Sequence, residues 1–84
     1  MKTVVIYTKS YCPYCHNAVA LLRKKGATYE EIDVTSDSTR EAEMQRKSGR
    51  DTVPQIWIGT HHVGGCDDLM ALDARGELDR MLAG

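Results

Sequence analysis

The sequence has little of what would assign it to a specialised class at once. Its 84 residues contain no phenylalanine, one tryptophan, two prolines and three cysteines. The longest clean apolar run near the start is Val4-Val5-Ile6, whereas a membrane-spanning helix needs about 20 apolar residues. No basic-then-apolar signal segment precedes this run. We therefore expect a soluble, cytoplasmic protein with no membrane partner.

Net charge is nearly absent as well. The chain has 11 basic and 12 acidic residues, a formal charge of −1, so a general attraction to nucleic acid is not expected. Hydrophobic residues make up 42% and charged residues 27%, an ordinary globular balance that argues against disorder. Since few chains of this length divide, we expect a single domain over residues 1–84, acting as a monomer.

The apolar pattern predicts an α/β domain with the element order βαβαββα. The first strand is β-branched without alternation, which is typical of a strand covered on both faces. Ser38-Thr39-Arg40-Glu41 fits a capping box with Ser38 as the cap. A strand, a helix and a strand in succession imply a right-handed crossover between parallel strands. Strands are expected over residues 3–7, 29–34, 55–58 and 61–63, and helices over 13–25, 38–49 and from 66 onward, with an interruption at Gly76.

The cysteines carry the clearest chemical signal. Cys12 and Cys15 enclose Pro13-Tyr14, and Cys66 stands far from them in sequence. An odd count without a signal peptide matches a secreted disulfide framework poorly. In a reducing compartment, such cysteines are catalytic or bind metal more often than they are structural.

The position of the pair predicts different roles for its members. Cys12 falls where a strand passes into a helix, so unpaired backbone N–H groups and the helix dipole favour its thiolate. Cys15 lies one turn further on, within disulfide reach and less exposed. We therefore expect Cys12 to attack and Cys15 to resolve the mixed disulfide.

A zinc site is the alternative interpretation of the pair. His61, His62 and Cys66 would have to supply the remaining ligands. They lie about 45 residues away, whereas structural zinc sites usually take their second ligand pair from a short loop. Pro13 at a helix start fits the redox interpretation better, so no metal is expected.

Three segments resemble the signatures of dithiol glutaredoxins, and the resemblance covers essentially the whole chain. They are Lys9-Ser10-Tyr11-Cys12-Pro13-Tyr14-Cys15, Thr52-Val53-Pro54-Gln55-Ile56 and Gly64-Gly65-Cys66-Asp67-Asp68-Leu69. The resemblance implies a thioredoxin fold, with a four-stranded mixed sheet in the order 2-1-3-4 and helices on both faces. It also implies a glutathione-dependent thiol–disulfide oxidoreductase that reduces protein disulfides and glutathione mixed disulfides. Glutathione would be its co-substrate, with no bound cofactor.

The same resemblance implies where glutathione binds. The Val53–Pro54 bond would be cis, and the Val53 backbone would pair with the cysteinyl part of the ligand. The helix start at Gly65-Cys66-Asp67 would hold the γ-glutamyl carboxylate, and Asp67 would accept the ligand's amino group. The implied glutathione-binding residues are Lys9, Tyr14, Thr52, Val53, Pro54, Gly65, Cys66 and Asp67.

Several residues stay open between two interpretations. By the resemblance, Lys9 would stabilise the Cys12 thiolate and meet the glycyl carboxylate; otherwise it is a lone lysine in a polar loop. Arg40 would either reach that carboxylate or remain a solvated helix charge. Cys66 would have a lowered thiol pKa at a helix start, or would be a small apolar filler. Trp57 is expected in the core or groove wall. We expect His61 and His62 to face solvent.

Two rival functions accompany the main one. Some glutaredoxins hold an iron–sulfur cluster between two monomers, although proline after the first cysteine is the pattern of members that usually do not. Thioredoxins are the rival among enzymes, but they commonly carry Gly-Pro between the cysteines. Disulfide-containing or glutathionylated proteins are the expected partners, with ribonucleotide reductase as an expectation from the family alone.

Overall fold

Four strands form one mixed sheet in the order β2-β1-β3-β4. In the computed structural model, which describes residues 1–84, the strands are β1 (Val4–Thr8), β2 (Tyr29–Asp33), β3 (Gln55–Ile58) and β4 (His61–Gly64). β1 pairs with β2 in parallel, and the other two pairings are antiparallel. The predicted sheet order is confirmed, and every strand boundary lies within one residue of its prediction.

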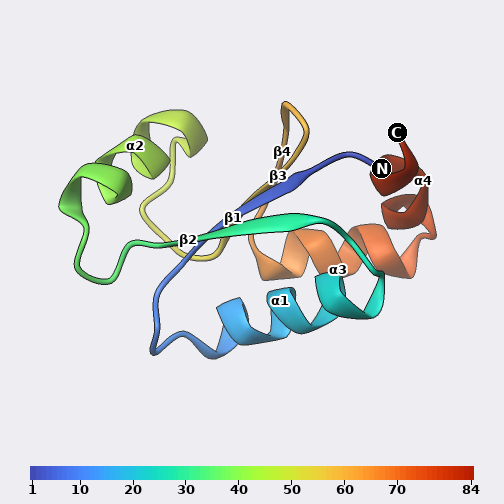
Figure 1. Cartoon of the computed structure of the whole chain (residues 1–84), viewed down its shortest axis with the longest axis horizontal. Helices are drawn as coiled ribbons and strands as arrows, with labels where there is room; N and C mark the ends of the chain where they lie inside the picture. Colours follow the sequence, from blue (N-terminus) through green and yellow to red (C-terminus); the bar gives the residue numbers. More distant parts are fainter.

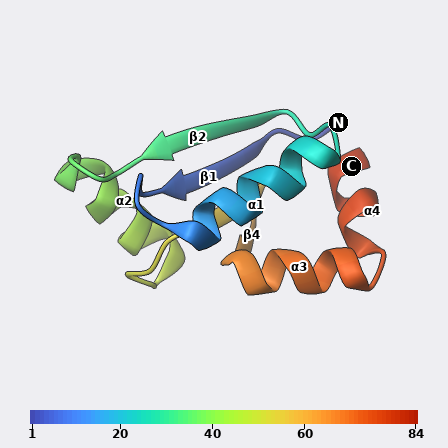
Figure 2. The same cartoon turned by 90° about the horizontal axis from the view of Figure 1, so that it is seen from below.

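Helices cover both faces of the sheet (Figures 1 and 2). They are α1 (Pro13–Lys24), α2 (Ser38–Ser48), α3 (Cys66–Ala74) and α4 (Glu77–Ala83). α1 and α3 lie on one face, and α2 lies on the other. Gly76, at φ 72°, separates α3 from α4 in the left-handed conformation that glycine adopts readily, as predicted. None of these helices has the length and apolar content needed to cross a membrane.

The hydrophobic core is divided by the sheet into two clusters. The side chains of β1 alternate between them, so that Ile6 lies in the larger cluster and Tyr7 in the smaller. The larger cluster, which includes α1, α3 and α4, contains Val4, Ile6, Ala18, Leu21, Leu22, Ile56, Ile58, Cys66, Leu69, Leu78 and Leu82. The smaller, on the side of α2, contains Tyr7, Val34, Met44 and Trp57. The strand before the Cys12–Cys15 pair, β1, and the helix that carries Cys15, α1, are thereby both packed in the core.

The predicted cap of α2 is wrong by one residue. Asp37 is the N-cap, and its Oδ1 accepts the backbone N–H of Arg40 at 3.0 Å. Ser38 is instead the first residue of the helix. Aspartate and serine are about equally good caps, so residue preference alone does not distinguish these two neighbours.

Candidate active site

Cys12 caps the N-terminus of α1. Its backbone is extended, and its sulfur accepts the backbone N–H of Cys15 at 3.1 Å. Pro13 takes the first helical position, where a missing N–H leaves no bond unmade. The first turn of α1 contains no acidic side chain. This position stabilises negative charge on the Cys12 sulfur through a hydrogen-bond donor and the positive end of the helix dipole.

Cys15 has a different environment. Its side chain is 1% exposed, against 8% for Cys12, and both cysteines are free thiols. Burial raises the pKa of the Cys15 thiol, and the neighbouring Cys12 sulfur adds to the shift. The expected asymmetry in exposure between the two cysteines is confirmed.

The loop that precedes β3 lies against the Cys12 sulfur. The Val53 carbonyl oxygen is 3.8 Å from Cys12 Sγ, although 41 positions separate the two residues. The Val53–Pro54 peptide bond is cis, as the resemblance implied. The Val53 backbone N–H has no hydrogen-bond partner within the chain, so a donor beside the reactive sulfur remains available to a ligand.

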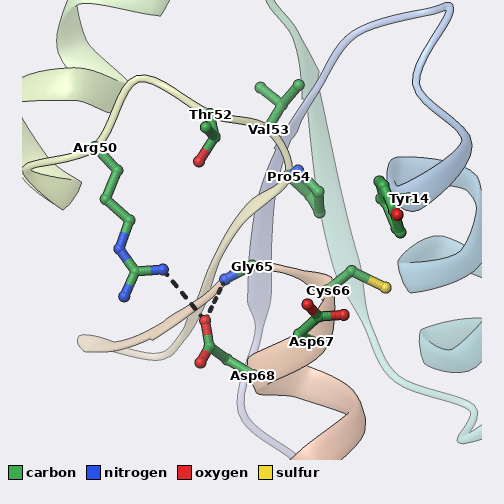
Figure 3. Close-up of a pocket in the computed structure, with 9 residues that line it drawn as sticks. All are labelled: Tyr14, Arg50, Thr52, Val53, Pro54, Gly65, Cys66, Asp67 and Asp68. Carbon is green, nitrogen blue, oxygen red and sulfur yellow. Dashed lines mark hydrogen bonds and ion pairs between the residues drawn. The ribbon is translucent and has the colours of Figure 1, made fainter.

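A cavity of about 220 Å³ adjoins this loop (Figure 3). α1 contributes Tyr14, which is 62% exposed, and the start of α3 forms the opposite wall. The lining residues are Tyr14, Arg50, Thr52, Val53, Pro54, Gly65, Cys66, Asp67 and Asp68. Seven of the eight residues predicted to bind glutathione are therefore brought together, and Lys9 is the one that does not line the cavity.

The start of α3 offers both donors and charge to the cavity. The backbone N–H groups of Cys66 and Asp67 have no partner within the chain, as at any helix N-terminus. Asp67 is exposed. The Asp68 side chain is instead directed toward Arg50 and Gly65. Its Oδ2 accepts the Gly65 N–H at 2.9 Å and pairs with Arg50 Nη1 at 3.2 Å. These contacts, led by the Gly65 N–H, lower the pKa of the Asp68 carboxyl.

The two candidate cations for a ligand carboxylate are already paired. Lys9 Nζ lies 2.7 Å from Glu41 Oε2 at the start of α2, and the hydrogen bond with Glu41 raises the pKa of Lys9. Arg40 Nη1 lies 3.0 Å from Glu43 Oε2 on its own helix. Such partly exposed pairs contribute little stability, so a ligand carboxylate can compete for either cation at small cost.

Of the two interpretations of Cys66, the structure supports the apolar filler. Its side chain belongs to the larger cluster, and burial raises the pKa of its thiol. The prediction for one histidine is wrong. His62 does not face solvent. Its ring is half-buried and stacks on Trp57 with 4.7 Å between the ring centroids. His61 is exposed as predicted, and Trp57 lies in the core.

Arg50 and Asp68 are the cavity residues that the sequence did not reveal as such. Their ion pair joins positions 18 residues apart, and neither residue type is unusual in its segment. Only the proximity of Arg50 to the Thr52-Val53-Pro54 segment could have suggested its place. No group of three or more His, Cys, Asp or Glu side chains has an arrangement that could hold a metal ion.

The fold and the capping dithiol define a thiol–disulfide oxidoreductase of the thioredoxin type. The glutaredoxin family matches residues 4–63. Glutaredoxin 3 of Escherichia coli K12 is 55% identical to this chain, over 98% of the chain and 99% of the relative. A glutaredoxin of Pseudomonas aeruginosa is 53% identical, over 99% of each.

Solved structures agree with this relationship. The solution structure of Brucella melitensis glutaredoxin is 56% identical with a TM-score of 0.86, covering 98% of this chain and 89% of that one. The buckwheat glutaredoxin–glutathione complex is 34% identical with a TM-score of 0.88, covering 95% and 76%. The chain belongs to the glutaredoxin family. It is a glutathione-dependent disulfide reductase with a dithiol active site.

Proposed function

We propose that Cys12 is the nucleophile of this reductase and Cys15 its resolving cysteine. The Cys12 thiolate attacks one sulfur of a protein disulfide, forms a mixed disulfide and releases the other substrate sulfur as a thiolate. Cys15, once deprotonated, attacks the Cys12 sulfur, so that the Cys12–Cys15 disulfide forms and the second substrate sulfur leaves. The observation that carries this assignment is the position of the Cys12 sulfur at the start of α1, 3.8 Å from the Val53 carbonyl oxygen.

Two glutathione molecules return the enzyme to its dithiol state. The first attacks the Cys12 sulfur as a thiolate, forms a Cys12–glutathione disulfide and frees Cys15. The second attacks the glutathione sulfur of that disulfide, so that glutathione disulfide leaves and the Cys12 thiolate is restored. With a glutathionylated protein as substrate, Cys12 alone accepts the glutathione. A separate reductase that uses NADPH regenerates glutathione.

We expect glutathione to bind the cavity in one orientation. Its cysteinyl part pairs with the free N–H of Val53 in the manner of an added strand, which brings its sulfur to Cys12. The γ-glutamyl carboxylate binds the free N–H groups at the start of α3, and exposed Asp67 accepts the amino group. Lys9 exchanges Glu41 for the glycyl carboxylate, and Tyr14 packs against the ligand.

The setting of this reaction follows from its reductant. We place the enzyme in the cytoplasm, where the glutathione pool keeps thiols reduced, and expect it to act as a monomer with no bound cofactor. Its partners are disulfide-containing or glutathionylated proteins, among which ribonucleotide reductase is the candidate that the family suggests.

A coupled assay tests this proposal. A small glutathione mixed disulfide is offered with glutathione, glutathione reductase and NADPH, and NADPH oxidation is followed. The rate should depend on the protein and on glutathione concentration, and should vanish in Cys12→Ser. Reduction by a thioredoxin reductase with no need for glutathione would contradict the proposal. So would a brown protein with visible absorption, purified anaerobically, that catalyses no exchange.

A further inference from the structure

Gln55 is a polar side chain with no exposure to solvent. It is the first residue of β3, directly after Pro54, and its backbone lies opposite Tyr7 of the central strand. A buried amide is costly unless its donors and acceptor are paired. Gln55 meets this condition with hydrogen bonds to two residues, Thr52 and His62.

The orientation of the Gln55 amide follows from these partners. Gln55 Nε2 donates to the Thr52 carbonyl oxygen at 3.1 Å and to Thr52 Oγ1 at 3.3 Å. A carbonyl oxygen only accepts, so the amide nitrogen must face Thr52 and Oε1 must face His62. His62 Nε2 lies 2.8 Å from Gln55 Oε1 and must therefore carry the proton that it donates. The stack on Trp57 holds the His62 ring in place.

These bonds extend from β4 to the cavity. Thr52 lines the cavity and begins the segment that carries the Val53 backbone beside Cys12. Because Thr52 Oγ1 accepts from Gln55, the hydroxyl proton is left to donate elsewhere. A ligand carboxylate only accepts, so a hydroxyl with this polarity suits an anionic ligand.

We propose that Gln55, held in place by its hydrogen bond with His62, is a positioning residue for glutathione recognition: it fixes the Thr52–Val53 backbone and directs the Thr52 hydroxyl proton toward the ligand. The inference rests on the proposed function, since it concerns the same cavity. Neither side chain touches the reacting sulfurs, so their effect falls on the binding of glutathione and leaves the reactivity of Cys12 unchanged.

The test compares five proteins: the unaltered chain, Gln55→Met, His62→Leu, His62→Gln and the control Gln45→Met. Methionine has the length of glutamine but no hydrogen bonds, and Gln45 is an exposed glutamine on α2. For each protein, the coupled assay gives kcat and the apparent KM for glutathione. Iodoacetamide labelling gives the intrinsic reactivity of Cys12, and thermal unfolding shows whether the protein is folded.

Gln55→Met should raise the KM for glutathione roughly five- to twentyfold, as expected for the loss of a few neutral hydrogen bonds. Its kcat and its Cys12 labelling rate should stay near those of the unaltered chain. His62→Leu should raise KM less, and His62→Gln, which retains an N–H donor, should restore it. Gln45→Met should change none of these values.

Three results would overturn the inference. One is an unchanged KM in folded Gln55→Met, and another is a parallel change in KM, kcat and Cys12 labelling, which indicates general loosening. If Gln55→Met does not fold, equal KM values in His62→Leu and His62→Gln decide against it. An unaltered chain that shows no dependence on glutathione would instead refute the proposed function itself.

Discussion

The Cys12 sulfur accepts the backbone N–H of Cys15 at 3.1 Å, so one member of the dithiol caps the helix turn that carries the other. Negative charge on an acceptor strengthens such a bond. The form of Cys12 that attacks a disulfide is therefore also the form that caps α1 best. The Val53 carbonyl, 3.8 Å from the same sulfur, places the ligand loop beside this cap.

Substitution of each cysteine should separate the two reactions. Cys12→Ser should abolish all exchange, because no other thiol caps α1 and Cys15 is almost fully buried. Cys15→Ser should keep reduction of glutathione mixed disulfides and lose most reduction of protein disulfides, since it lacks only the resolving step. NADPH-coupled assays with a small mixed disulfide and with a protein disulfide measure the two activities. Full activity of Cys12→Ser would refute the assignment.

The three thiols should differ in their labelling by iodoacetamide. Burial raises the pKa of both Cys15 and Cys66, and only thiolates alkylate rapidly. In the folded protein, Cys12 should be modified first at neutral pH, whereas Cys15 and Cys66 should react only at a pH above that needed by an ordinary thiol. Peptide mass spectrometry after timed labelling locates the modification. In urea, where burial is lost, the pKa values of Cys15 and Cys66 should return to that of an ordinary thiol, and both should be labelled as fast as one. Slow labelling of these two cysteines in urea would contradict the explanation.

Asp67 should matter for glutathione and not for the reactivity of Cys12. Asp67→Ala removes one charge-assisted hydrogen bond to the ligand, worth about 1.5–3 kcal/mol, or roughly ten- to a hundredfold in affinity. Glutathione kinetics should weaken accordingly, with unchanged iodoacetamide labelling of Cys12. Asp51→Ala, an exposed aspartate outside the cavity, is the matched control. Equal kinetics in both variants would leave Asp67 only its interaction with the helix dipole.

Asp68 should make the stability of the fold depend on pH in the acid range. Its pKa lies below the ordinary value of 3.8, chiefly because of the Gly65 N–H and with help from Arg50. A lowered folded pKa means that the stabilisation is complete above about pH 4 and is lost as the pH falls through the folded pKa. Asp68→Asn should therefore unfold at a lower temperature than the unaltered chain at pH 7, with the difference shrinking in acid.

Thermal unfolding at several pH values measures this effect. Asp51→Asn serves as the control, since the exposed Asp51 side chain forms no hydrogen bond or ion pair. A gap between Asp68→Asn and the unaltered chain that stays constant from pH 7 into acid would show that charge on Asp68 plays no part.

Much of the fold could be predicted from local sequence. Hydrophobic periodicity, the glycines and, for α2, a capping motif placed the helices and strands, because side-chain spacing, backbone freedom and capping act over a few residues. Adjacent cap candidates were not distinguishable in this way. Asp37 and Ser38 are similar in preference, and in the folded chain the non-helical backbone at Asp37 makes it the cap.

The active site, too, could be predicted only in part from the sequence. The sequence by itself determined the chemistry: a cysteine pair at a helix start, with proline between its members, specifies a dithiol whose first sulfur caps the helix. Only the tertiary structure decided what surrounds that sulfur. The Val53 carbonyl beside Cys12, the Lys9–Glu41 pair, the Arg50–Asp68 pair and the burial of Cys66 and His62 join residues that are distant in sequence. Their contacts depend on how helices and loops pack around the sheet, which no local preference encodes.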